Sequence, residues 1–425
     1  MDDNRLGVWT FERDGEQIAW GRPGVTDEER AAAGRETLAA VRAALLAENR
    51  SRAALAMEAA LPEGQDVLRV WASRDPRDLR ARLGGERLAV WAEGDVLHVL
   101  WRGEDGPPNV GGGLQPVLWP VDGAPDLWEA SVRVRGLDEA VIELHVVPER
   151  PSHRDHRNHG EHGDHGKHGH HGEHRADGHV TVRWRGPRAP SPAPGPAEVT
   201  GVVERHELRF LGEARGVTVY RPPGAAGPLP GCVMADGQFV PALARTLEPA
   251  VLAGDVPPFV LVGVHCASGT GGADETGDAR GREYIPSSDP PRFAAHLAFV
   301  ADTVLGWARE TCGAAAGPWI AAGVSNGADW ALGAACRRPD VFRKVAALSP
   351  GSPPSQDDPS AAGGAPARCY LGAGTLESGF RESARDWAVA LSGRGCAVRH
   401  EEWIGGHDAY WWSQRLPVAL AFLLA

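Results

Sequence analysis

Ser325 lies in the sequence GVSNG at positions 323–327, a G-x-S-x-G pattern in which a serine hydroxyl could act as a nucleophile. The pattern alone is weak evidence, because the chain contains 54 glycines. Its surroundings are more specific, since the apolar run PWIAA precedes it and the helix-forming run ADWALGAACRR follows it. Hydrolases hold a nucleophilic serine on such a sharp turn between a strand and a helix. The alternative is an ordinary glycine-rich turn.

A serine hydroxyl needs a general base, and His407 in the sequence GGHDAYWW is the candidate. His407 lies between the last strand-like run and the last helix-like run, where a loop can return over the serine. Glu377, in GAGTLES, follows the strand-like run RCYLG, so the order along the chain is Ser, acid, His. Glu377 could instead be an exposed acidic residue at a helix start. Asp408 adjoins His407 and is poorly placed to reach the far ring nitrogen.

These three residues predict hydrolysis of an ester through an acyl-serine intermediate, with His407 as general base and then general acid. The helix that begins after Ser325 would direct the positive end of its dipole at the developing oxyanion. This chemistry requires no metal or organic cofactor.

The residues that must position this chemistry, 199–425, alternate between strand-like and helix-like runs. The strand candidates are GVTVYRPP, GCVMADG, FVLVGVH, WIAAGVS, VAALSPG, RCYLGAG and CAVRHEEW. The helix candidates are 293–311, 327–337, 379–394 and 409–424. Continuous apolar strands that alternate with helices predict an α/β fold with a mostly parallel sheet covered on both faces.

The first half of the chain has a different pattern. Residues 1–65 predict a hairpin with its turn at Asp14-Gly15, followed by helices over 26–50 and 53–61. From about residue 67 the apolar period becomes two, and residues 66–186 predict an all-β sandwich. Four tryptophans fall in or beside these strands, as core residues or as a platform for a ligand: Trp91, Trp101, Trp119 and Trp128.

Residues 153–179 contain ten histidines and no apolar residue that could support a core, which predicts a disordered or extended loop inserted in the sandwich. The histidines are His153, His156, His159, His162, His165, His168, His170, His171, His174 and His179. Neutral imidazoles at this spacing could bind Zn²⁺, Ni²⁺ or Cu²⁺ in several weak sites. The alternative is a repeat without function. A proline-rich linker over 187–198 follows.

Composition limits the partners and the compartment. A formal net charge of −12 argues against nucleic acid and against an anionic membrane surface. No apolar run approaches the roughly 20 residues that a membrane span needs, and the first residues do not resemble a secretory signal. The six cysteines form no C-x-x-C pair, which predicts reduced thiols in a cytoplasmic protein. The sequence gives no indication of the oligomeric state.

Several segments of the second half resemble the enterochelin (ferric enterobactin) esterase and esterase D-like branch of the α/β-hydrolases. They are VTVYRPPG, VMADGQ with LEPAVLAGDVPPFVLVGV, RGREYIP, AGVSNGADWALGAACRRPDVF and GGHDAYWW. More weakly, VLHVLWRG and PDLWEASVRV resemble the immunoglobulin-like module that precedes the hydrolase domain in enterochelin esterases. The histidine-rich segment and the first 60 residues depart from the family pattern.

The resemblance implies an immunoglobulin-like sandwich followed by an α/β-hydrolase domain, with Ser325, His407 and Glu377 as its triad. It also implies an oxyanion hole made by the N–H of Asn326 and an N–H near Gly237 or Gln238. Arg280, which opens RGREYIP, would face an anionic or catecholate-rich substrate. Alternatively, Arg280 is a structural residue paired with an acidic neighbour such as Glu283.

Three function classes follow from these observations. The first is a cytoplasmic serine esterase that acts on a ferric siderophore or a related catechol ester. The second is a serine esterase for feruloyl, acetyl, peptide or thioester substrates. The third is a metal-binding protein on a hydrolase scaffold, which the complete Ser–acid–His order argues against. In each esterase class the partner is a small-molecule ester.

Overall fold

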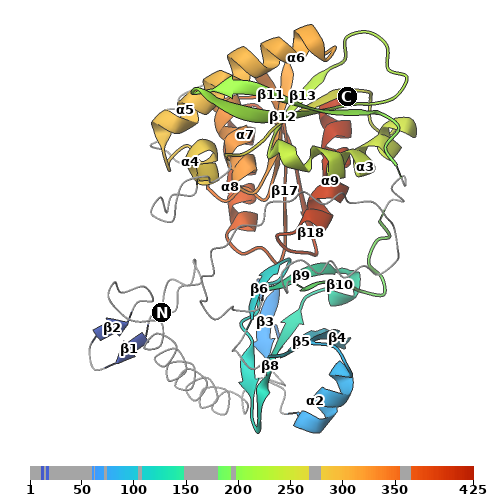
Figure 1. Ribbon diagram of the computed structural model, residues 1–425, viewed down its shortest axis with the longest axis vertical. Coiled ribbons are helices and arrows are strands. Elements are labelled where there is room, and N and C mark those ends of the chain that lie inside the picture. The colour runs from blue at the N-terminus through green and yellow to red at the C-terminus, as the bar shows by residue number, and fades with distance from the viewer. Residues whose placement is uncertain are drawn as a thin grey trace, which may run out of the picture.

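The computed structural model describes residues 11–13, 16–18, 60–61, 63–70, 74–103, 108–147, 180–192, 198–267, 279–354 and 365–425. These residues form an α/β unit at the C-terminal end of the chain and a smaller β unit before it (Figure 1). The short strands β1 (Phe11–Arg13) and β2 (Glu16–Ile18) pair antiparallel where the sequence predicts an N-terminal hairpin. The predicted helices over 26–50 and 53–61 lie almost wholly outside the described residues, and the histidine-rich segment 153–179 lies outside them entirely.

The α/β unit is built on one eight-stranded sheet in the order β11-β12-β14-β13-β15-β16-β17-β18. Its strands are β11 (Val202–Phe210), β12 (Glu213–Arg221), β13 (Gly231–Ala235), β14 (Val260–Val264), β15 (Trp319–Val324), β16 (Phe342–Leu348), β17 (Arg368–Gly374) and β18 (Ala397–Trp403). The β11 and β12 strands pair antiparallel, and all pairings from β13 to β18 are parallel. The strands β13, β14 and β15 are buried along their whole length, as expected for a sheet covered on both faces.

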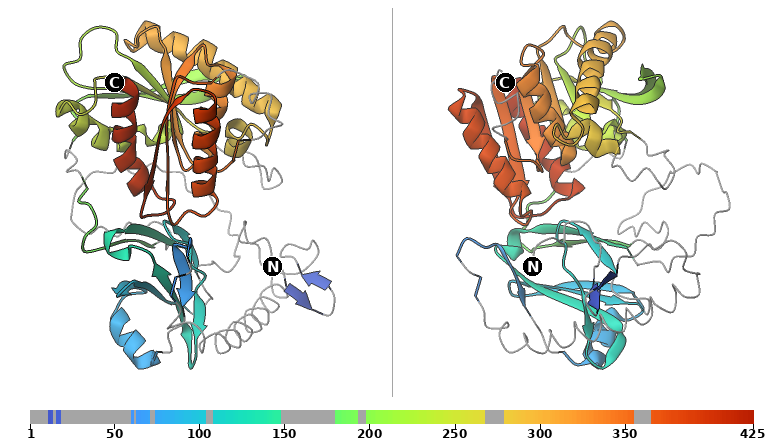
Figure 2. Two further views of the ribbon diagram at one scale, coloured as in Figure 1. Left: turned by 180° about the vertical axis from the view of Figure 1, so that it is seen from behind. Right: turned by 90° about the vertical axis from the view of Figure 1, so that its left-hand side faces the viewer.

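Helices cover both faces of this sheet (Figures 1 and 2). Alternate residues of β13 point to opposite faces, with Val233 in one apolar cluster and Cys232 in the other. One face carries α3 (Val240–Leu252) and α9 (Ala409–Leu424). The other carries α5 (Pro290–Ala298), the π-helical segment η3 (Phe299–Val304), α6 (Leu305–Thr311), α7 (Asn326–Arg337) and α8 (Phe380–Gly393). The short elements η2 (Gly237–Phe239) and α4 (Ala279–Tyr284) lie near the ends of the strands.

The β unit consists of two antiparallel sheets that share one apolar core. One sheet contains β3 (Val67–Val70), β8 (Ala124–Val134), β5 (Val96–Arg102) and β4 (Leu88–Glu93), with β7 (Trp119–Val121) paired to β8. The other contains β10 (Val180–Arg185), β9 (Val141–Val147) and β6 (Asn109–Gly112). The helices are α2 (Pro76–Leu83) and the 3₁₀ turn η1 (Leu137–Glu139). The immunoglobulin-like character of this unit and the domain boundaries remain predictions.

The tryptophans of the β unit serve mainly as core residues. Trp101, Trp119 and Trp128 have 1%, 5% and 0% of their surface exposed. Trp91 differs, because its half-buried ring lies beneath the guanidinium groups of Arg74 and Arg82. Three of the four tryptophans are therefore core residues, whereas the ring of Trp91 is covered by two arginine side chains.

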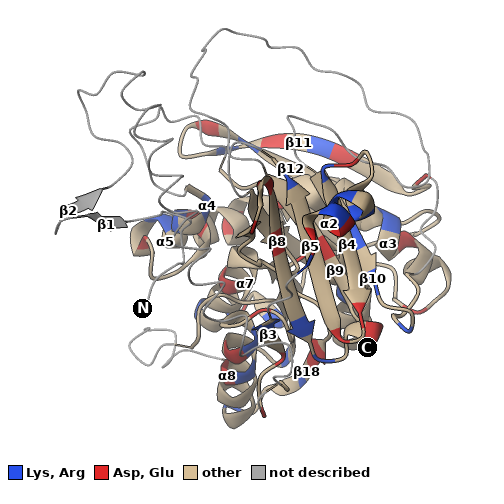
Figure 3. Cartoon of the chain, turned by 90° about the horizontal axis from the view of Figure 1, so that it is seen from below, with Lys and Arg blue, Asp and Glu red and all other residues tan. Residues whose placement is uncertain are grey.

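Charged residues of both signs are interspersed along the described elements (Figure 3). Many are paired, for example Arg80 with Asp126 in the β unit and Arg385 with Glu402 in the α/β unit. The six cysteines are free thiols. In the part of the chain that the structure describes, no helix combines the length and the apolar character that a membrane crossing requires.

Candidate active site

Ser325 occupies the turn between β15 and α7 and has a strained backbone. Its φ is 56° and its ψ is −132°, a conformation that residues other than glycine rarely adopt. The flanking glycines make this turn possible, because a Cβ on Gly323 would overlap the carbonyl group of Gly327. A Cβ on Gly327 would lie 3.0 Å from the side chain of Ala235 on the adjacent strand β13. The G-x-S-x-G pattern is therefore required by the close approach of strand and helix.

The structure brings Ser325, His407 and Glu377 together from three separate loops. Nε2 of His407 lies 3.0 Å from Oγ of Ser325, and Nδ1 lies 2.7 Å from Oε2 of Glu377. Because a carboxylate accepts hydrogen bonds, Nδ1 carries the proton and Nε2 is free to accept the serine proton. Glu377 follows β17, and His407 lies between β18 and α9, so both come from the carboxyl ends of parallel strands.

Glu377 is buried, with 4% of its surface exposed, which contradicts its interpretation as an exposed residue at a helix start. Its Oε1 accepts hydrogen bonds from the Gly374 amide at 2.6 Å and the Ser349 hydroxyl at 2.9 Å. The Ser349 oxygen in turn accepts from Nε1 of Trp412 at 2.9 Å. These hydrogen bonds fix Oε1 of Glu377 in place, so that Oε2 faces Nδ1 of His407.

Two aromatic side chains fix the plane of the His407 ring. Phe380 lies against the ring with centroids 4.2 Å apart at 35°, and Trp412 meets it edge-on at 4.7 Å and 89°. Sequence reasoning did not identify Ser349, Trp412 or Phe380 as site residues. Ser349 had one available signal, since it is a polar residue directly after a buried parallel strand.

The predicted oxyanion donors lie at the ends of neighbouring strands. Asn326 is the first residue of α7, so its N–H has no carbonyl partner within the helix. Gly237 and Gln238 begin η2 after β13, which pairs with β15. The Gln238 side chain already bonds to Asp236 at 3.3 Å and to Sγ of Cys266 at 3.2 Å, which leaves its backbone as the candidate donor.

Arg280 forms a bidentate ion pair with buried Asp236, with N–O distances of 2.8 and 2.7 Å. Glu283, the partner suggested by sequence proximity, is instead fully buried against Arg215 and Arg292. The suggested Arg280–Glu283 pairing is therefore wrong, because Glu283 points into the core of the α/β unit. Arg280 keeps 28% of its side chain exposed.

Two further buried carboxyl groups lie near the triad. Burial raises the pKa of Asp408 to about 7, and Oδ1 of this residue accepts from the Trp411 amide at 3.0 Å, which caps α9. Burial likewise raises the pKa of Asp329 to about 7, and its carboxylate accepts from the backbone and hydroxyl of Ser352. In this structure, the carboxylate that contacts His407 is therefore Glu377.

Among the described residues, no group of three or more His, Cys, Asp or Glu side chains is arranged to hold a metal ion. The ten histidines predicted as metal ligands lie outside those residues.

Comparison with known proteins gives a family and a set of similar structures. Residues 209–423 match the family described as "Putative esterase". Among solved structures, the enterobactin esterase of Shigella flexneri, determined in the presence of enterobactin, is 16% identical with a TM-score of 0.56. That match covers 79% of this chain and 95% of the other. The ferric enterobactin esterase of Salmonella typhimurium is 18% identical with a TM-score of 0.55, covering 81% of this chain and 98% of the other. At these identities the likeness shows a shared fold, and no curated protein matches the chain by sequence.

Proposed function

This chain belongs to the esterase family, and we propose that it is a serine esterase in which Ser325 attacks the carbonyl carbon of a carboxylic ester. The observation that carries the proposal is the continuous contact from Ser325 through His407 to Glu377, at 3.0 and 2.7 Å. The strained serine turn and the helix that begins directly after it add to this support.

In the proposed reaction, Nε2 of His407 accepts the hydroxyl proton as Oγ of Ser325 bonds to the ester carbonyl carbon. Glu377 stabilises the imidazolium through Nδ1–H, and the oxyanion accepts from the N–H groups of Asn326 and of Gly237 or Gln238. The bond to the alcohol oxygen then breaks as His407 returns the proton to it. Water attacks the acyl-serine by the same proton route, which releases the acid and restores Ser325.

The substrate that we propose is a catecholate ester of the siderophore class, hydrolysed to release iron in the cytoplasm. The shared fold with two solved enterobactin esterases supports this choice. Phe239, in the η2 turn that would supply an oxyanion donor, is 53% exposed and offers an apolar contact for an aromatic acyl group. The free thiols are those expected in a reducing compartment.

A general carboxylesterase for simpler acyl groups is the second candidate. The observation that favours it is the bidentate pairing of Arg280 with Asp236, which neutralises the cation proposed to face an anionic substrate. A substrate carboxylate or catecholate would have to compete with a buried aspartate for this guanidinium.

Turnover of a ferric tricatecholate trilactone, measured beside nitrophenyl acetate and nitrophenyl butyrate, separates the two candidates. The siderophore proposal expects a kcat/KM for the trilactone well above those for the simple esters. Comparable values, or none for the trilactone, would leave the general esterase.

Ser325→Ala tests the serine mechanism, with Ser413→Ala as the matched control because that hydroxyl donates to the Tyr410 carbonyl within α9. Loss of a triad serine costs on the order of 10⁶ in kcat in a protease. We expect Ser325→Ala to abolish turnover and labelling by a fluorophosphonate, while Ser413→Ala keeps both. Persistent turnover in the Ser325→Ala variant would exclude the mechanism.

A further inference from the structure

The two loops that carry Glu377 and His407 lie at the end of the α/β sheet that faces the β unit (Figure 1). The acid loop comprises residues 375–381, between β17 and α8, and the base loop comprises residues 404–408, between β18 and α9. Leu376 of the acid loop and Ile404 of the base loop both pack against the apolar core of the β unit. The residue next to the catalytic acid thus has apolar partners outside the α/β unit.

The base loop also contacts the β unit backbone to backbone. A Cβ on Gly406, the neighbour of His407, would overlap the carbonyl group of Gly113. Gly113 is itself held by the β unit, because its amide donates to the Glu143 carbonyl at 2.6 Å. A Cβ on Gly113 would lie 2.6 Å from Oδ2 of Asp408. The path of the base loop on both sides of His407 is therefore limited by Gly113.

A buried hydrogen bond continues this contact into α9. Nε1 of Trp411 donates to the carbonyl of Val141, the first residue of β9, at 3.0 Å. The amide of the same residue donates to Asp408, so the first turn of α9 is tied to the base loop and to the β unit together. The guanidinium of Arg183 on β10 lies 5.0 Å from the ring centroid of Tyr410 in that turn.

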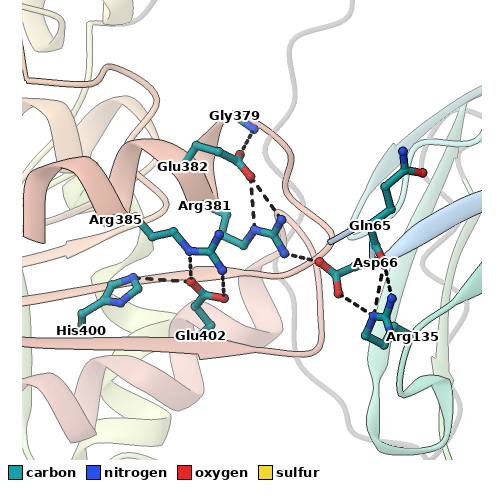
Figure 4. A network of polar contacts seen from close by, with 9 residues as sticks. All are labelled: Gln65, Asp66, Arg135, Gly379, Arg381, Glu382, Arg385, His400 and Glu402. Carbon is teal, nitrogen blue, oxygen red and sulfur yellow. Dashed lines mark hydrogen bonds and ion pairs between the residues drawn. The ribbon is translucent and has the colours of Figure 1, made fainter. Parts of the chain in front are cut away.

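On the acid side, an ion pair crosses between the units (Figure 4). Arg381 pairs with Asp66, which also contacts Arg135 at 3.3 Å. The side chains of Arg381 and Asp66 are only 13% and 16% exposed, so solvent screens the pair weakly. The amide of Arg381 donates to the Glu377 carbonyl at 3.0 Å, which connects the ion pair to the backbone of the acid.

The two loops are also bonded to each other, because the Leu376 amide donates to the Gly405 carbonyl at 3.0 Å. We propose that the β unit is a positioning part of the catalytic machinery, which holds Glu377 and His407 in register with Ser325. This inference rests on the proposed serine mechanism. Ser325 follows β15, a central strand of the sheet, whereas the loops that carry its two partners contact the β unit. A displacement of about 1 Å at that junction is enough to cost about 100-fold in rate.

Gly113→Ala in the full chain tests the proposal, with Gly85→Ala as its matched control. A Cβ on Gly85, in the same unit, meets no atom within 4 Å. We expect Gly113→Ala to lower kcat between about 10-fold and 100-fold with little change in KM. The acid limb of its pH–rate profile should also move, because the imidazolium partly loses its carboxylate partner. Gly85→Ala should change neither. Thermal unfolding of each variant shows whether the fold is kept.

Asp66→Asn supplies a second variant that does not introduce a clash, with Asp126→Asn as its control. Asp126 forms a similar pair with Arg80 inside the β unit. We expect a loss of about two- to fivefold in kcat for Asp66→Asn and none for Asp126→Asn. If Gly113→Ala does not fold, this pair decides the question.

Equal kcat values and pH profiles for each variant and its control would overturn the positioning role. A variant whose activity falls only in proportion to its folded fraction would overturn it as well. Ser325→Ala in the same series separates the two proposals. Activity retained in that variant contradicts the serine mechanism, whereas an inactive Ser325→Ala beside normal Gly113 and Asp66 variants contradicts only the positioning role.

Discussion

Replacing Glu377 with Gln should damage catalysis through the protonation state of His407. Oε1 of Glu377 accepts from Gly374 and Ser349, so this side of the group must remain an acceptor. In Glu377→Gln the amide oxygen would take that side, and the NH₂ group would face Nδ1 of His407. The imidazole would then accept at Nδ1 and carry its proton on Nε2, the atom that must take the proton of Ser325.

The size of the effect follows from this wrong tautomer. The corresponding aspartate-to-asparagine change in a serine protease keeps the geometry and lowers kcat by about 10⁴, and we expect a similar loss here. Asp408→Asn is the matched comparison, because Asp408 caps α9 through Oδ1 and an asparagine can accept the same bond. Its kcat should stay within about threefold of the native value.

Initial rates with nitrophenyl butyrate, together with burst amplitudes for acylation, measure both variants. A larger loss in Asp408→Asn than in Glu377→Gln would show that the wrong carboxylate has been assigned. Small and equal losses would indicate a Ser–His dyad in which neither carboxylate is needed.

Three further outcomes are expected. Ser349→Ala removes one of the donors to Glu377 and should lower kcat by about 10-fold, measured beside the Ser413→Ala control. Burial raises the pKa of Asp408 to about 7, so its ionisation lowers the free energy of unfolding as the pH rises from about 4 to 7. Asp408→Asn removes this ionisation, and it should therefore raise the thermal midpoint at pH 8 and leave it unchanged near pH 4. Deleting residues 153–179 should keep ester turnover, because β9 and β10 on either side of this segment pair with each other directly. The deletion should remove most of the Zn²⁺ or Ni²⁺ binding that calorimetry measures at pH 7.5. Metal binding by the full chain should weaken below about pH 6.5, and equal binding by the shortened chain would exclude this segment as the metal site.

The sheet of the α/β unit could be predicted because its signal is local. Runs such as GCVMA and VLVGV are apolar along their whole length, and only a strand buried on both faces needs that composition. The period-two interpretation of the β unit passes over α2, although Asp75 as its N-cap and Pro76 at its first position are both standard helix signals.

The ion pair of Arg280 could not be predicted from residues close to it in the sequence. Proximity in the sequence suggested Glu283 as an acidic neighbour, but the actual partner Asp236 lies 44 positions earlier, directly after β13. The topology of the parallel sheet brings that strand end beside α4, and spacing along one helix holds no information about it. For the same reason no motif points to Trp412, which donates to the Ser349 oxygen, and the one signal for Ser349 is its place directly after a buried strand.

Sequence patterns predict the residues that react, but they do not predict the residues that hold the reacting groups in place. Ser325, Glu377 and His407 each follow a strand of the parallel part of the sheet, so the order of strands and helices places all three at the carboxyl ends of those strands. Gly113 and Asp66 follow no such rule, because their importance comes from contact between two units that the chain forms separately. The family match begins at residue 209, and both residues lie before it. If the β unit positions the catalytic loops, the α/β unit alone does not hold Glu377 and His407 in the geometry that catalysis requires. The rate of the full chain then depends on Gly113 and Asp66, which lie outside the residues that match the family.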